Sequence, residues 1–189
     1  MLLLAGCGSS HTATHTSVAP VTETATIPRG LLAGARPIGR GPRFTPALRG
    51  RPTGSCTPRL GARALAHVEL FAANRVMLVA AGVGTLPPRT AIDGRIRSAR
   101  CYGDVVTLDP TGVIYYRGRP TVGDLFRAWG WPLSANRLAS FRGPVRVYVG
   151  GHRAPGAFPP AVPLTPHAEI VLEVGPFVPP HSRYTFDPS

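Results

Sequence analysis

The sequence predicts an α+β fold: a mostly antiparallel sheet with one covering helix, for which a β-grasp-like arrangement is the leading topology. Two observations support this fold class. Runs rich in β-branched and aromatic residues, separated by turn residues, lie on both sides of one helical segment. In addition, the length of 189 residues fits one domain with a tail rather than two ordinary domains.

Strand pairs precede the helical segment. Residues 67–71 and 76–79 predict two strands joined by a turn at Asn74, and residues 96–101 predict a weaker strand. Between them, AGVGTLPPRT contains two glycines and a proline pair and predicts irregular structure. Residues 104–108 and 113–116 flank Asp109-Pro110-Thr111-Gly112, whose proline and glycine are typical of a tight turn.

The helix is predicted from Thr121, because Thr121-Val122-Gly123-Asp124 has the spacing of a capping box. Apolar residues follow at helical spacing, and Gly130 and Pro132 end the element. Two further strands are predicted at 145–149, where apolar and polar residues alternate, and at 169–174. The helix therefore has strands before and after it in the chain.

The chain is strongly cationic, with a formal net charge of +12, and all 21 of its basic residues are arginine. Together with 22 Gly and 22 Pro, this bias is typical of a GC-rich genome such as an actinobacterial one. From Arg29 to Arg63 there are eight arginines and no acidic residue. Such a segment attracts anionic lipid or an anionic wall polymer. Nucleic acid is not expected as a partner. Nucleic-acid-binding segments usually carry several aromatic residues, whereas this one has only Phe44, and an exported protein would not meet nucleic acid.

The first residues resemble the end of a bacterial lipoprotein signal. Leu4-Ala5-Gly6-Cys7 matches a lipobox, in which Cys7 receives the lipid, and a Ser/Thr-rich tract follows. A signal peptide also needs a positive start and about 7–15 apolar residues, so we expect the true start upstream of Met1. The sequence predicts four parts: a signal remnant at 1–7, a disordered tether at 8–54, an α+β domain at 55–175 and a Pro-rich tail at 176–189.

The two other cysteines are Cys56 and Cys101. In an oxidising envelope they are expected to form a structural disulfide, and two unpaired buried thiols are the alternative. A redox site needs closer spacing such as C-x-x-C, and a zinc site needs four ligands at short spacing. The sequence has neither pattern around these cysteines.

From Cys56 to Phe186 the chain resembles an uncharacterised family of exported bacterial and archaeal domains. No single motif is diagnostic, and the resemblance rests on their order. The matching pieces are Cys56, His67-x-x-x-Phe71, residues 80–84 (AAGVG), Cys101, residues 112–114 (GVI), residues 121–130 (TVGDLFRAWG), residues 163–170 (PLTPHAEI), Tyr184 and Phe186.

The resemblance implies a His-rich domain whose alternating imidazoles could hold a transition metal. This chain departs from that pattern, because the first cluster retains only His67, and the run after the second cysteine reads Val-Thr-Leu-Asp, with Tyr115 after Ile114. We therefore expect no metal and no other cofactor, and a non-catalytic binding or scaffold domain on a lipid-anchored protein at the outer face of the cell membrane. The alternative is a metal-binding or metal-handling envelope protein with a reduced site of His67, Asp109 and Tyr115.

Overall fold

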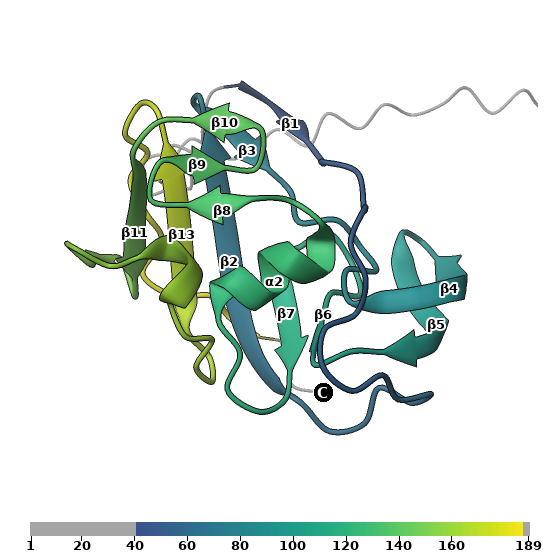
Figure 1. Cartoon of the computed structure of the whole chain (residues 1–189). Helices are drawn as coiled ribbons and strands as arrows, with labels where there is room; N and C mark the ends of the chain where they lie inside the picture. Colours follow the sequence, from purple (N-terminus) through teal and green to yellow (C-terminus); the bar gives the residue numbers. More distant parts are fainter. Residues whose placement is uncertain (1–40, 187–189) are drawn as a thin grey trace, which may run out of the picture. The chain divides into compact units, whose positions relative to one another are not determined.

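The computed structural model describes residues 41–186, so the lipobox and Cys7 lie outside the described part. Its main sheet has the order β1-β3-β2-β13-β11-β12, with β7 pairing with the other part of β2 and β6 pairing with β7 (Figure 1). The bounds are β1 Gly41–Phe44, β2 Ala64–Ala72, β3 Arg75–Met77, β6 Val105–Val106, β7 Val113–Tyr116, β11 Val145–Val149, β12 His152–Arg153 and β13 Glu169–Val174.

Two smaller sheets and the helical elements complete the described chain. A three-stranded sheet contains β8 (Leu133–Ser134), β9 (Arg137–Leu138) and β10 (Phe141–Arg142), and a separate hairpin contains β4 (Thr85–Ile92) and β5 (Arg95–Tyr102). The α-helix α2 spans Val122–Trp129, and a 3₁₀ turn, η1, spans Pro159–Ala161. Over residues 41–186, no helix has the length and apolarity that crossing a membrane requires.

The main sheet is mixed rather than simply antiparallel. β13 runs parallel to β2, with Glu169 opposite His67 and Val174 opposite Ala72, and it runs antiparallel to β11. β1 is also parallel to its neighbour β3. The structure thus confirms strands combined with a single short helix in the described residues, while the central pairing joins segments about a hundred residues apart in sequence.

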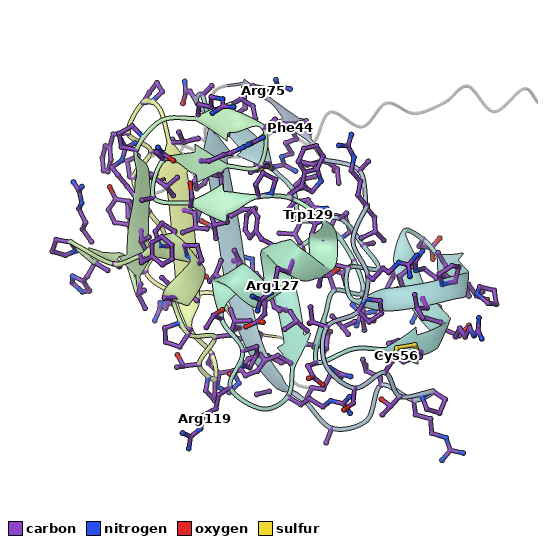
Figure 2. The ribbon with its side chains drawn as sticks, in the orientation of Figure 1. Phe44, Cys56, Arg75, Arg119, Arg127 and Trp129 are labelled. Atoms are coloured by element: carbon purple, nitrogen blue, oxygen red, sulfur yellow. A yellow bond between two sulfur atoms is a disulfide. The ribbon has the colours of Figure 1, made fainter. Side chains whose placement is uncertain are left out.

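One face of the main sheet packs against α2. Val122, Leu125, Phe126 and Trp129 of the helix share a buried cluster with residues of β2 and β13 such as Leu70. Trp129 points into this core, whereas Arg127 lies at the surface (Figure 2). The eight-residue helix covers only part of the face, and Leu138 of β9 belongs to the same cluster. The small three-stranded sheet therefore supplies some of the cover that the sequence analysis assigned to the helix.

The helix begins as predicted. The Thr121 hydroxyl oxygen accepts from the Asp124 backbone N–H at 3.3 Å, and the Asp124 carboxylate accepts from the Thr121 N–H at 2.8 Å. Burial alone raises the pKa of Asp124, but the hydrogen bonds from Thr121 and Arg127 outweigh it, so the pKa lies below its usual value. The folded state therefore holds Asp124 ionised at pH values where an unfolded aspartate is protonated.

Replacing Asp124 with alanine is expected to lower the free energy of unfolding by about 1 kcal/mol at pH 7. Because the folded pKa is depressed, this stabilisation is present above the unfolded pKa of about 3.9 and is lost as the pH falls through the folded value. Urea unfolding of the wild type and the variant at pH 7 and pH 3 checks this. A difference in stability that is the same at both pH values would contradict the role given to the carboxylate.

The other face of the main sheet is partly charged. Successive side chains of a strand alternate between the two faces, so His67, Glu69 and Phe71 share this outer face with Glu169 and Glu173. Residues 176–186 of the C-terminal segment contact it. Val178 packs on Phe71, Tyr148 and Val171, and the His181 and Tyr184 side chains lie against polar residues of the same face.

Two segments differ from the sequence prediction. Residues 85–92 form β4 although a proline pair interrupts them, because the β4–β5 register shifts between Leu86 and Arg89 and so accommodates the prolines. Residues 41–54, assigned to the tether, lie on the domain. The Arg75 guanidinium lies over the Phe44 ring of β1 at 4.3 Å (Figure 2), and the Trp129 indole donates to the Pro46 carbonyl oxygen at 3.3 Å. Contacts of this kind have no sequence periodicity that would reveal them.

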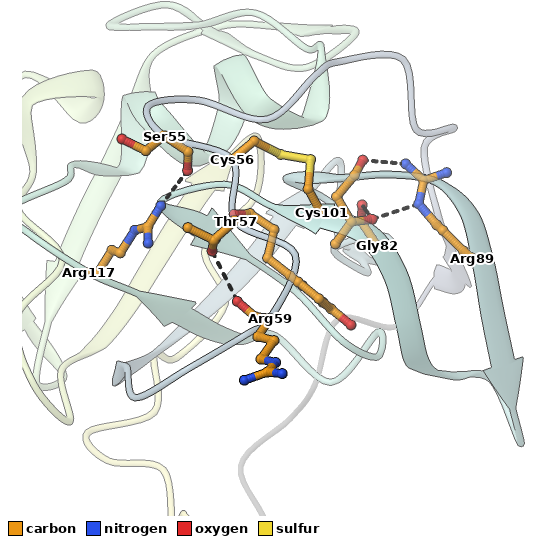
Figure 3. The surroundings of a disulfide bond; sticks show 10 residues. Ser55, Cys56, Thr57, Arg59, Gly82, Arg89, Cys101 and Arg117 are labelled. Atoms are coloured by element: carbon orange, nitrogen blue, oxygen red, sulfur yellow. Dashed lines mark hydrogen bonds between the residues drawn. A yellow bond between two sulfur atoms is a disulfide. The ribbon is translucent and has the colours of Figure 1, made fainter.

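Cys56 and Cys101 are joined by a disulfide, as predicted, with their Cα atoms 5.4 Å apart (Figure 3). The bond attaches the segment before β2 to β5. Beside it, Thr57 and Tyr102 exchange two backbone hydrogen bonds of 3.0 and 2.8 Å. The disulfide therefore reinforces an existing contact between these two segments.

Candidate functional site

Four titratable side chains gather on the outer face of the main sheet. His67 and Glu69 are two residues apart on β2 and so point to the same side. Glu169 of β13 lies directly opposite His67, and His181 reaches the group from the C-terminal segment. Two parts of the chain about a hundred residues apart, β2 and β13 with the segment that follows it, therefore meet at one place.

The His67 imidazole is held on three sides. Its Nδ1 is 2.8 Å from Oε2 of Glu169, and its Nε2 donates to the Thr111 carbonyl oxygen at 2.8 Å. The Tyr184 ring stacks on the imidazole with the two ring centroids 3.9 Å apart. These contacts leave His67 4% exposed, so its orientation is fixed by the fold.

The Thr111 carbonyl is positioned by the turn between β6 and β7. Gly112 has a φ of +89°, and a Cβ atom on it would lie 2.9 Å from the His67 Nε2 and 2.6 Å from the Val68 carbonyl oxygen. Glycine is therefore required for the turn to approach β2 so closely. Asp109 stabilises the same turn by accepting a hydrogen bond from the Thr111 N–H at 3.2 Å.

His67 and Glu169 share a proton. A carbonyl oxygen only accepts, so the Nε2 of His67 carries hydrogen, and a second hydrogen lies between Nδ1 and Glu169. Burial opposes the charge on His67, but the hydrogen bond and charge of Glu169 outweigh it and raise the pKa of the imidazole. Burial is also the main cause that raises the pKa of Glu169. The pair therefore keeps this proton at pH values above the usual pKa values of histidine and glutamate.

The Glu69 carboxylate and the second carboxylate oxygen of Glu169 lie close to the His67–Glu169 pair. Ligand atoms of His67, Glu69 and Glu169 all lie within 4.8 Å of one another. Oε1 of Glu169 is buried and has no hydrogen-bond partner among the described residues. Glu69 is oriented by Nδ1 of His181, which is 2.7 Å from its carboxylate oxygens. An imidazole nitrogen and two carboxylates therefore converge, and one buried oxygen lacks a partner.

A cavity of about 490 Å³ adjoins this group. Its polar lining consists of His67, Glu69, Thr111, His181 and Tyr184, with Arg43 of β1 also at its wall. The remaining lining residues are Gly112, Pro110 and apolar residues of β2, β3 and the segment after β3. His181 and Tyr184 belong to the C-terminal segment, so that segment borders the route by which a small ligand would reach Glu69. The cavity is large enough for an ion with several water molecules.

Of the three residues in the alternative metal site predicted from the sequence, His67 alone belongs to this group. Asp109 and Tyr115 instead meet at Arg95: the guanidinium pairs with the Asp109 carboxylate and donates to the Tyr115 hydroxyl at 2.9 Å. Asp109 touches the His67 group only indirectly, through the turn. Cys7 and the first part of the arginine-rich segment lie outside the described residues.

Sequence reasoning missed Glu69, Glu169 and His181. A signal was present, because the glutamates at positions 169 and 173 are four residues apart, on one face of a strand whose other residues are all apolar. Buried carboxylates are rare unless they are paired or bind metals. The pairing of β2 with β13 was needed to place Glu169 beside His67, and no local pattern reveals it.

Comparisons with protein-family models, with curated proteins and with solved structures find no match to this chain.

Proposed function

We propose that this chain is a lipid-anchored envelope protein whose domain binds one divalent transition-metal ion, without catalysis, at His67, Glu69 and Glu169. The observation that carries the proposal is the convergence of these three ligand groups within 4.8 Å, including a buried carboxylate oxygen that lacks a partner. We therefore favour the metal-binding alternative over a binding domain for an unspecified ligand. The proposed ligands are His67, Glu69 and Glu169 in place of His67, Asp109 and Tyr115.

The surroundings of His67 are those of a metal-binding histidine. Such histidines commonly donate their second ring N–H to a backbone carbonyl, which fixes the tautomer and directs the other nitrogen to the ion. Here Nε2 donates to Thr111 and Nδ1 faces the carboxylates. Tetrahedral ligands about 2.1 Å from an ion lie about 3.4 Å apart, so small rotations of Glu69 and Glu169 would close the site. The proton between Nδ1 and Glu169 leaves when the ion binds.

The donor set indicates the class of metal. One imidazole nitrogen with two carboxylates suits Zn²⁺ and other first-row divalent ions. Ca²⁺ and Mg²⁺ prefer oxygen ligands alone, and Cu⁺ prefers sulfur. His181, which contacts Glu69, orients that carboxylate in the way that outer ligands of metal sites do.

The proposal also includes the finer fold and the location. A β-grasp-like arrangement is supported by the pairing of the first long strand, β2, with the last strand, β13, to which it runs parallel. In the sheet, β13 lies between β2 and β11. A lipid on Cys7 is supported by the lipobox sequence, and an envelope location agrees with the disulfide.

Zinc titration of the full-length chain tests the function. All proteins carry Cys7→Ser, so that a free thiol contributes no ligand, and calorimetry measures stoichiometry and affinity. We expect one Zn²⁺ per chain. His67→Ala is expected to weaken binding by more than about 100-fold, because even outer-shell partners contribute about 10- to 100-fold.

Glu69→Gln is the decisive variant. Glu69 hydrogen-bonds to His181 and not to His67 or Glu169, so we expect the variant to keep the His67–Glu169 hydrogen bond and the fold, yet to bind zinc at least tenfold more weakly. Asp93→Asn, at the exposed tip of the β4–β5 hairpin, is the matched control and is expected to bind as the wild type does. Equal affinities of Glu69→Gln and Asp93→Asn would refute the site. His11 and His15, which lie outside the described residues, are the other histidines near the start of the chain, and loss of binding in the double variant His11→Ala/His15→Ala would place the ion there instead.

A further inference from the structure

A second cavity, about 480 Å³ in volume, is lined by four arginines from two separate segments. Arg49 and Arg51 follow β1, whereas Arg89 is on β4 and Arg100 on β5. The other lining residues are Leu48, Gly50, Leu86 and Pro87, none of which is acidic. We call this cavity the arginine cleft.

Among residues 41–186 no carboxylate lies within ion-pairing distance of Arg49, Arg51, Arg89 or Arg100. Four of the seven acidic residues in the described chain pair with the arginines at positions 95, 117, 127 and 146, and two more contact histidines on the outer face of the main sheet. The seventh, Asp93, lies at the exposed tip of the β4–β5 hairpin. Like charges that share a small cleft repel one another, and a bound anion would relieve that repulsion.

The fold orients Arg89, one of the two arginines of the cleft that lie on the β4–β5 hairpin. The guanidinium of Arg89 donates from Nε to the Thr85 hydroxyl at 2.6 Å and from Nη2 to the Thr85 carbonyl at 2.5 Å (Figure 3). Thr85 is 1% exposed, and its hydroxyl donates to the Gly82 carbonyl at 2.7 Å. The partial burial of Arg89 lowers its pKa, so the fold holds this cation where water stabilises it less well.

The segment that carries Arg49 and Arg51 is held against the end of α2. The backbone N–H groups of Arg49 and Gly50 donate to the Trp129 carbonyl oxygen at the end of α2, at 3.0 and 2.9 Å. A Cβ atom on Gly50 would lie 2.3 Å from the Ala128 carbonyl oxygen, so this close approach requires glycine. The Arg49 guanidinium lies 4.3 Å over the Trp131 ring, which limits its rotation.

We propose that the arginine cleft binds a phosphate group. Guanidinium groups match the geometry of phosphate oxygens with paired N–H donors, which is why arginine is favoured where proteins bind phosphate, and this cavity has four arginines in its lining. The group is either free inorganic phosphate or the phosphate of an anionic lipid headgroup. This site is separate from the metal site and does not depend on it.

Phosphate binding to the full-length Cys7→Ser chain tests the proposal in two arms: calorimetry with inorganic phosphate, and co-sedimentation with vesicles of phosphatidylcholine with or without phosphatidylglycerol. We expect Arg89→Gln and Arg100→Gln to weaken binding at least tenfold in whichever arm the wild type binds. Arg100 makes no hydrogen bond among those described, so its loss tests the cleft without disturbing the fold.

Arg97→Gln is the matched control, because it removes one exposed charge from the same hairpin outside the cleft. It is expected to bind as the wild type does. Binding of inorganic phosphate identifies a free-phosphate site, and binding only of phosphatidylglycerol vesicles identifies a headgroup site. Absence of binding in both arms would overturn the proposal. An equal loss in Arg97→Gln would also overturn it, because general cationic attraction would then explain the binding.

Discussion

Replacing Cys56 and Cys101 with serine is expected to lower the free energy of unfolding by about 4 kcal/mol. The two cysteines are 45 residues apart, and the disulfide restricts the unfolded chain by closing that loop. The loss is large for a domain of this size, whose total stability is of the order of 5–15 kcal/mol. The backbone hydrogen bonds between Thr57 and Tyr102 remain in the variant but no longer have the covalent link beside them.

Guanidinium unfolding of the full-length wild type and the double variant measures this effect. Cys7→Ser is the control and is expected to leave the stability unchanged, since Cys7 has no part in the described bond. Reducing the wild type should produce the same loss as the double variant. A difference below about 1 kcal/mol would show that the disulfide does not constrain the unfolded chain as the loop-entropy account requires.

Replacing Arg146 with methionine is expected to lower the free energy of unfolding at pH 7 by about 3–5 kcal/mol. Glu173 is fully buried on the outer face, and Arg146 donates to its Oε2 from Nε and Nη2 at 3.2 and 3.1 Å. Arg146 also donates to the carbonyl oxygens of Gly175 and Pro176, where the C-terminal segment begins. Without the arginine, a buried carboxylate would lose its counter-charge.

The pH dependence of the Arg146→Met variant tests this cause. Burial already raises the pKa of Glu173 in the wild type, and removing Arg146 takes away the hydrogen bonds and the charge that oppose burial most strongly, leaving the smaller effects of the Val178 backbone and of Arg153. Between the unfolded and the raised folded pKa, the folded state binds more protons, so stability falls as the pH rises. We therefore expect the variant to regain stability as the pH is lowered from 7 to 5.

A double variant separates the lost charge from lost packing. Arg146→Met/Glu173→Leu removes both charges and is expected to recover most of the stability, because buried ion pairs can often be replaced by apolar residues. Arg142→Met, at an exposed position of β10, is the control and should change the stability by less than about 0.5 kcal/mol. A single variant as stable as this control would contradict the role assigned to the ion pair.

The sequence was sufficient for the elements whose signals are local. The capping residues Thr121 and Asp124 and the apolar spacing after them predicted α2, and the Pro-Thr-Gly turn predicted the β6–β7 hairpin. The strand β4 was missed because its proline pair indicated irregular structure, whereas a register shift accommodates it in a two-stranded hairpin. Local patterns thus predicted the helix, the longer strands of the main sheet and the pairs joined by a tight turn, but not the short strands β8–β10 and β12 or the pairing of strands far apart in sequence.

The candidate site depended on those partners. His67 and Glu169 are 102 residues apart, and their contact follows from the parallel pairing of β2 with β13, which no turn or repeat indicates. His181 reaches the same face from a proline-rich segment without periodicity. The sequence could therefore identify His67 as a candidate ligand, but it predicted the wrong partners for it. Asp109 and Tyr115, which are close to each other in sequence, both contact Arg95 instead.

The central claim is that His67, Glu69 and Glu169 bind one divalent transition-metal ion. The most direct measurement is a crystal structure of the zinc-loaded protein, with anomalous diffraction data collected on both sides of the zinc absorption edge. We expect one strong anomalous peak about 2.0–2.2 Å from Nδ1 of His67 and from one oxygen of each glutamate. A fully zinc-loaded crystal with no peak there, and with the 2.8 Å hydrogen bond between His67 and Glu169 unchanged, would contradict the account.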